Sequence, residues 1–143
     1  MAVDKMDWHS TTFHDSIPSE NAGTHIGMYL AWLINHDMIE AEWFDDFGEE
    51  FNKVKNREMT GRELLIECFD ETLLEDVLTD EAIEFTSEFY DSEYLDQYAD
   101  VLGDNGYTGD LAMYMYEDSW ENYEKVEEMI DAAYERFADR EEV

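Results

Sequence analysis

The most apolar segment of the chain, residues 20–38, predicts one long buried helix. Small residues recur within it at every fourth position, at Gly23, Gly27 and Ala31. Because residues four apart share one face of a helix, they form a stripe along which a second helix can approach closely. Large apolar residues fill the rest of the circumference. We therefore expect this helix to lie at the centre of the fold, with Ser19 as its N-cap.

Five further segments have apolar residues at the three- and four-residue spacings that are typical of amphipathic helices. Local signals indicate where some of them begin: Thr60 and Glu63 have the spacing of a capping box, and Thr79 precedes acids that favour a first helical turn. Gly103 ends the helix that begins at Ser92. The predicted helices cover residues 40–56, 61–69, 80–91, 92–102 and a last segment from about 118.

These elements predict an all-α protein of about five to six helices that folds as a single compact domain. A helical body, residues 19–143, follows an irregular N-terminal arm, residues 1–18. Residues 103–118 fit no helical pattern, and we expect a short strand or an irregular stretch near 107–116. Apolar residues make up 44% and aromatic residues 15% of the chain, which suits a packed core and not a disordered acidic segment.

The charge of the chain is strongly one-sided. Its 39 acidic residues face eight Lys and Arg, and the net charge is −31. Residues 63–124 hold 20 acids and no Lys, Arg or His. Such a surplus opposes folding through self-repulsion. It is accounted for by a surface that complements a cationic partner, by mimicry of nucleic acid, or by general acidic adaptation such as that of halophiles.

We favour the cationic partner, because general adaptation would spread the acids evenly along the chain. Their concentration in a segment without cations predicts one coherent negative surface, and we expect the partner to bind there. Nine acids of this segment, which we call the acidic set, are the candidate partner-binding residues: Asp70, Glu71, Glu75, Asp76, Asp80, Glu84, Glu88, Asp91 and Asp96.

The four histidines include one group with the right composition for a metal site. His9, His14 and His25 converge if the N-terminal arm folds over the start of the central helix, and three imidazoles with an aspartate suit zinc. His25 and His36 lie roughly 16 Å apart along a helix, too far to share an ion. The chain lacks the helical pair of histidines found in known zinc motifs. We therefore expect no bound metal, and histidines hydrogen-bonded to backbone and carboxylate groups.

Catalysis has no recognisable motif in this chain. A calcium loop that starts at Asp100 or Asp104 needs a glutamate at its twelfth position, where Leu111 and Met115 stand. A P-loop, a nucleophile elbow and a dinucleotide-binding glycine pattern are all missing. With 39 acids, no single pair of carboxylates indicates glycosidase chemistry. We expect neither enzymatic activity nor a cofactor.

Cysteine usage and hydropathy indicate the compartment. The single Cys68 excludes an intramolecular disulfide and fits a reducing environment. The first residues lack the basic and apolar regions of a secretory signal. The longest apolar run, residues 26–34, is about half of a membrane span, and anionic headgroups would repel the chain. We expect a cytoplasmic protein that binds neither membranes nor nucleic acid directly.

Several stretches resemble a family of small acidic bacterial proteins that look like immunity proteins, the antidotes of polymorphic and secretion-system toxins. The stretches are residues 21–32 (NAGTHIGMYLAW), 60–64 (TGREL), 89–90 (FY) with 94–98 (YLDQY), and 118–123 (DSWENY). They are similar to scaffold and capping segments of that family and carry no catalytic residue. The resemblance implies a protein that binds a cognate toxin domain and blocks its basic active-site cleft.

Two other functions stay open. A nucleic-acid mimic of phage or plasmid origin would block several DNA-binding proteins, whereas an immunity protein blocks one cognate toxin. A histidine-based metalloenzyme would contain a stoichiometric metal. The toxin interpretation agrees best with the charge, because acidic inhibitors complement basic clefts and associate rapidly with them.

Overall fold

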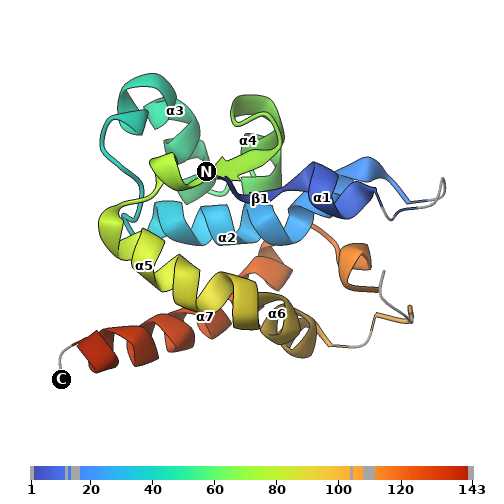
Figure 1. Cartoon of the computed structure of the whole chain (residues 1–143). Helices are drawn as coiled ribbons and strands as arrows, with labels where there is room; N and C mark the ends of the chain where they lie inside the picture. Colours follow the sequence, from blue (N-terminus) through green and yellow to red (C-terminus); the bar gives the residue numbers. More distant parts are fainter. Residues whose placement is uncertain (1, 12, 14–16, 104, 108–111, 142–143) are drawn as a thin grey trace.

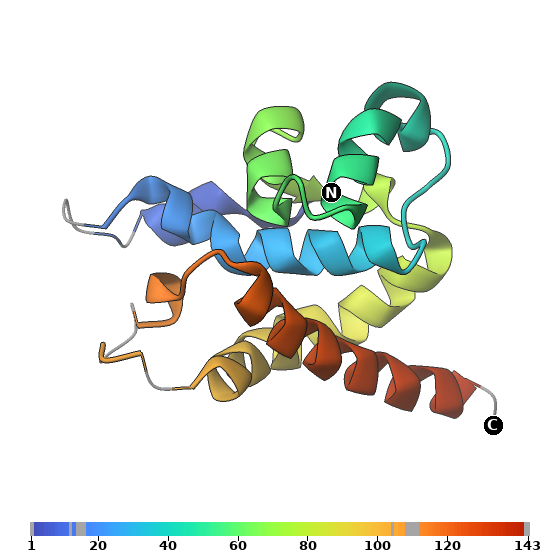
Figure 2. The same cartoon turned by 180° about the vertical axis from the view of Figure 1, so that it is seen from behind.

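A helix that is buried on all sides forms the centre of the protein. Helix α2, Thr24–Asn35, runs through the middle of the computed structural model, and every residue from 24 to 34 is buried (Figures 1 and 2). A helix that is apolar all round needs neighbours on every face. On one side lie α3, Trp43–Lys55, and α4, Gly61–Cys68; on the other lie α5, Asp80–Phe89, α6, Leu95–Leu102, and α7, Trp120–Glu141. The prediction of a central buried helix is confirmed.

The structure describes residues 2–11, 13, 17–103, 105–107 and 112–141. It is 72% helical, with seven α-helices and one two-stranded sheet in these ranges, so the mainly helical fold in a single compact domain is confirmed. The helices exceed the predicted five to six because a short helix lies in the N-terminal arm. No helix within the described ranges is both long enough and apolar enough to cross a membrane.

Gly23, just before α2, and Gly27, within it, contact two different neighbours. Gly27 meets the first turn of α4, where a Cβ atom on Gly27 would overlap the backbone of Arg62, and one on Gly61 would overlap the carbonyl of Gly27. A Cβ atom on Gly23 would instead lie 2.7 Å from the sulfur of Met6. Gly27 and Gly61 thus let the backbones of α2 and α4 touch, as the spacing predicted.

Helix ends agree with the local sequence signals at several positions. Thr60 and Glu63 form a complete capping box, and the Thr79 hydroxyl accepts a hydrogen bond from the Ala82 backbone. Gly103 ends α6 with a φ of 76°, a conformation that favours glycine. These caps are local, so a single sequence is enough to predict them.

Two predicted helix starts were wrong. Residues Ser19–Gly23 form a 3₁₀ turn before α2, and Pro18, not Ser19, precedes it. No new helix begins at Ser92, because a π-helical turn, Tyr90–Tyr94, joins α5 directly to α6. The Ser92 hydroxyl donates to the carbonyl of Glu88 at 2.8 Å, within this continuous helical segment.

The arm is not irregular, which corrects the prediction for residues 2–10. Strand β1, Ala2–Lys5, pairs antiparallel with β2, Thr72–Leu74, and α1, Met6–Ser10, follows at once. The strands therefore lie at 2–5 and 72–74 and not near 107–116, where Ala112–Met115 form a 3₁₀ turn and residues 108–111 lie outside the described part. Pairing places the arm over the N-terminal half of α2 (Figure 1).

The contact between α2 and α4 generates the first prediction. Gly27→Ala should lower the free energy of unfolding by about 1–3 kcal/mol or more, because rigid backbone faces the new methyl group. Gly48→Ala is the matched control: nothing lies within 4 Å of its Cβ position, and alanine favours the α3 helix by about 0.5–1 kcal/mol. Denaturant unfolding measures both. Equal effects of the two substitutions would contradict the close approach.

Candidate functional site

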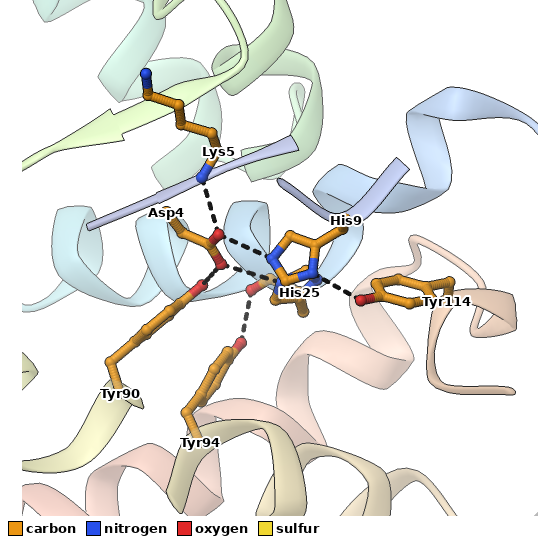
Figure 3. A network of polar contacts seen from close by, with 7 residues as sticks. All are labelled: Asp4, Lys5, His9, His25, Tyr90, Tyr94 and Tyr114. Carbon is orange, nitrogen blue, oxygen red and sulfur yellow. Dashed lines mark hydrogen bonds and ion pairs between the residues drawn. The ribbon is translucent and has the colours of Figure 1, made fainter. Parts of the chain in front are cut away.

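The buried carboxylate of Asp4 is the focus of a polar cluster beneath the arm. Asp4 lies on β1 opposite Leu73 of β2, and only 4% of its surface is exposed. Its side chain points away from the sheet toward α2 and the turn Tyr90–Tyr94 (Figure 3). The Lys5 backbone N–H donates to the Oδ1 atom of Asp4 at 2.8 Å. The sheet therefore fixes the position of this carboxylate.

Three side chains complete its hydrogen bonds, and two of them, His25 and Tyr90, come from distant parts of the chain. The Nε2 atom of His9 lies 2.8 Å from Oδ1, and the Nε2 atom of His25 lies 3.2 Å from Oδ2. The Tyr90 hydroxyl donates to Oδ2 at 2.6 Å. With the Lys5 amide, four groups contact the two carboxylate oxygens. A buried carboxylate needs such partners to stay charged.

Outer contacts hold the His9 ring and the His25 backbone. The Nδ1 atom of His9 lies 2.6 Å from the Tyr114 hydroxyl, and the Tyr94 hydroxyl donates to the backbone carbonyl of His25 at 2.6 Å. The two rings meet edge to face with centroids 4.5 Å apart. The arm, α2, the Tyr90–Tyr94 turn and the Ala112–Met115 turn thus all converge on one carboxylate (Figure 3).

The protonation states in this cluster follow from its burial. Burial alone would raise the pKa of Asp4, but hydrogen bonds from His25, His9 and Tyr90 outweigh it and hold that pKa well below its usual range. Burial lowers the pKa of His25 despite the nearby carboxylate, and burial and the Asp4 charge raise the pKa of Tyr90. At neutral pH the cluster holds an ionised Asp4, a neutral His25 and a protonated Tyr90.

The cluster opens to solvent at its His9 side. A surface cavity of about 150 Å³, large enough for several water molecules, is lined by Val3, Asp4, Trp8, His9, Tyr90 and Leu95. Trp8 is 56% exposed at its rim, and the Lys5 ammonium lies 5.8 Å from the Trp8 ring centroid. His25 is 1% exposed, so the site is closed on the α2 side and accessible on the arm side.

A family match covers most of this site. The model of a family described as a domain of unknown function, DUF7832, matches residues 2–110, which is more than half of the chain. The chain belongs to this family. Asp4, His9, His25 and Tyr90 all lie within the DUF7832 match, whereas Tyr114 lies beyond its end. No curated protein and no solved structure matches the chain.

The structure places the histidines of this DUF7832 chain in two different settings. His9 and His25 meet, as the metal hypothesis required, and His14 lies outside the described residues. His36 lies apart from them, with Nδ1 2.9 Å from the Trp32 carbonyl and Nε2 2.9 Å from the Asp131 carboxylate. Asp4 is the aspartate that the sequence could not single out among 39 acids, because its burial depends on pairing with β2.

The acidic set lies on the surface but on several elements. Asp70, Glu71, Asp76, Asp80, Glu84, Glu88 and Asp96 are exposed, Glu75 is half-buried, and the side chain of Asp91 lies outside the described part. Asp70 and Glu71 precede β2, Glu75 and Asp76 lie in the 3₁₀ turn Glu75–Val77, and Asp96 lies on α6. Asp80, Glu84 and Glu88 share one face of α5, because they are four residues apart.

Three ion pairs of Lys and Arg among the described residues involve acids outside the acidic set. Lys55 pairs with Asp37, Arg57 with Glu124 and Arg62 with Asp118. These three cations thus pair with carboxylates elsewhere than in the acidic set.

Substitutions of two buried tyrosines test how much the contacts of Asp4 contribute to stability. Tyr90→Phe removes a hydrogen bond to a charged group and should lower the free energy of unfolding by about 1.5–3 kcal/mol. Tyr98→Phe is the matched control, because the buried Tyr98 hydroxyl has no hydrogen-bond partner among the described residues. That control should be neutral or stabilising. Urea unfolding measures the free energy of unfolding of both variants. An equal loss for Tyr98→Phe and Tyr90→Phe would refute this role of Tyr90.

Proposed function

We propose that the protein binds a cationic protein partner and blocks it, in the manner of a bacterial immunity protein that neutralises a toxin domain. The observation that carries this proposal is the exposure of seven of the nine acids in the acidic set. A chain with a net charge of −31 attracts a basic protein over the range of a Debye length, about 8 Å at physiological salt. Electrostatic complementarity raises association rates and excludes partners of the wrong sign.

A groove with apolar side chains at its base lies beside the acids of α5. A cavity of about 260 Å³ between α5 and α7 is lined by Phe85, Phe89, Ala133 and Phe137, with Glu88, Glu93 and Arg136 at its edge. Protein interfaces combine an apolar centre with a polar rim, and their strongest contacts are anchors that fill pockets. An apolar side chain surrounded by Lys or Arg on the partner would fit this arrangement.

The resemblance of residues 21–32, 60–64, 89–90 with 94–98, and 118–123 to immunity-like proteins supports an inhibitory role. A toxin that acts on nucleic acid has a basic cleft, and acids inserted into that cleft exclude its substrate. On this proposal the cognate toxin domain is the partner, and the protein affects nucleic acid only indirectly, by competition.

Matched charge reversals test the proposed surface. Asp80→Lys with Glu84→Lys on α5 should slow association with a toxin domain encoded beside this gene by about tenfold at low salt, with less effect at high salt. Asp45→Lys with Asp46→Lys on α3 is the control, because these acids also lie on a helix at its surface and change the net charge equally. The control should associate at a rate close to wild type.

The outcomes separate this proposal from its rivals. Equal slowing by both pairs would mean that net charge alone acts, and no slowing by either would remove the acidic set from the interface. If only Trp8→Ala or Trp43→Ala abolishes protection against the toxin, the interface lies at the arm and α3. Inhibition of several unrelated DNA-binding proteins would identify a nucleic-acid mimic instead.

A further inference from the structure

Asp4, His9 and His25 present the donor set of a transition-metal site. One carboxylate oxygen or imidazole nitrogen from each residue lies within 4.8 Å of the others, and no other group of His, Cys, Asp or Glu in the described ranges meets this criterion. Zinc lies about 2.0–2.2 Å from such ligands, which places tetrahedral ligand atoms roughly 3.3–3.5 Å apart. The Nε2 atom of His9 lies 2.8 Å from Oδ1 of Asp4, and the Nε2 atom of His25 lies 3.2 Å from Oδ2, so small outward shifts bring each nitrogen to this separation from its own carboxylate oxygen.

We propose that Asp4, His9 and His25 bind one divalent transition-metal ion of the zinc type. The donors are two Nε2 atoms and one carboxylate, contributed by β1, α1 and α2. The histidines lack the helical spacing of known zinc motifs, so the sequence predicted no metal. The arm supplies the missing proximity by folding His9 over the first turn of α2.

The hydrogen bonds around His9 and Asp4 can stay in place when these residues act as metal ligands. Metal-bound imidazoles usually donate their second ring N–H to a fixed acceptor. When the Nε2 atom of His9 binds a metal, its proton lies on Nδ1 and is donated to the Tyr114 hydroxyl 2.6 Å away. Tyr90 and the Lys5 amide continue to donate to the Asp4 carboxylate, which fixes its orientation.

The cavity at the arm gives an ion access to solvent. Asp4 and His9 line it, whereas His25 closes the inner side. Three protein ligands leave a tetrahedral ion one further position, and water from the cavity can take it. Two imidazoles favour zinc, cobalt or nickel over magnesium, which prefers the all-oxygen surroundings that the exposed acids provide. Selectivity for transition metals therefore distinguishes this site from the acidic surface.

Metal titration of the isolated protein tests the site. Zinc and cobalt are titrated into metal-free protein in excess magnesium, which occupies the exposed carboxylates, and a competing chelator of known affinity sets the scale. Wild type should bind one equivalent, and cobalt should give the visible absorption of a site with imidazole ligands. His9→Gln should weaken binding by about 100-fold or more, and Tyr114→Phe by roughly tenfold, as expected for an outer partner.

His36→Gln is the matched control, because His36 also contacts a carboxylate, Asp131, but belongs to no such cluster among the described residues. It should bind zinc like wild type, and zinc should raise the melting temperature of wild type and His36→Gln but not of His9→Gln. The proposal is overturned if wild type binds zinc no more tightly than His9→Gln, or if His36→Gln loses binding equally. Circular dichroism checks that His9→Gln is folded, and the assay contains no partner, so its result is independent of the proposed inhibition.

Discussion

The buried charge of Asp4 is the constraint on which the arrangement of the arm depends. A carboxylate taken out of water costs several kcal/mol unless its lone pairs are satisfied, and an amide, two imidazoles and a tyrosine hydroxyl satisfy those of Asp4. Because these donors come from separate segments, the charge cannot be satisfied until the arm, α2 and the Tyr90–Tyr94 turn are in place together. Local contacts alone would not order residues 2–10.

The protein uses its carboxylates in two distinct ways. Asp4 is buried, holds its charge through hydrogen bonds and orients two histidines, whereas the acids on α5 are exposed and stay hydrated. The first kind of carboxylate suits a metal or a fixed polar network, and the second suits long-range attraction of a cationic partner. The net charge of −31 sums over both kinds of carboxylate, although each kind has its own role.

The sequence predicts features whose causes lie within a few residues. The capping box of Thr60 and Glu63, the cap at Thr79 and the end of α6 at Gly103 all follow from local chemistry. The approach of α4 to α2 follows from the spacing of small residues, although Gly61 as the partner of Gly27 does not. Exposure of the acids on α5 follows from helical periodicity.

Features that depend on distant parts of the chain could not be predicted in this way. Strand β1 forms by pairing with β2, which lies about 70 residues away in the sequence. Pairing across such a distance leaves no local pattern in the sequence. The burial of Asp4 follows from that pairing. His9 and His25 could be grouped by residue type, but their contact needed the arm to fold, and Tyr90 and Tyr114 carried no signal beyond being aromatic.

Hydrogen exchange on an Asp4→Asn variant tests most directly whether one buried charge joins these segments. An asparagine keeps the shape of the side chain but replaces one acceptor oxygen with a donor and removes the charge. Exchange should accelerate together in residues 2–10 and 90–98, while the amides of α3, which contributes no side chain to the cluster, keep their protection. Faster exchange in the arm alone, or equally across the whole protein, would contradict the claim that the Asp4 charge holds the arm, α2 and the Tyr90–Tyr94 turn together.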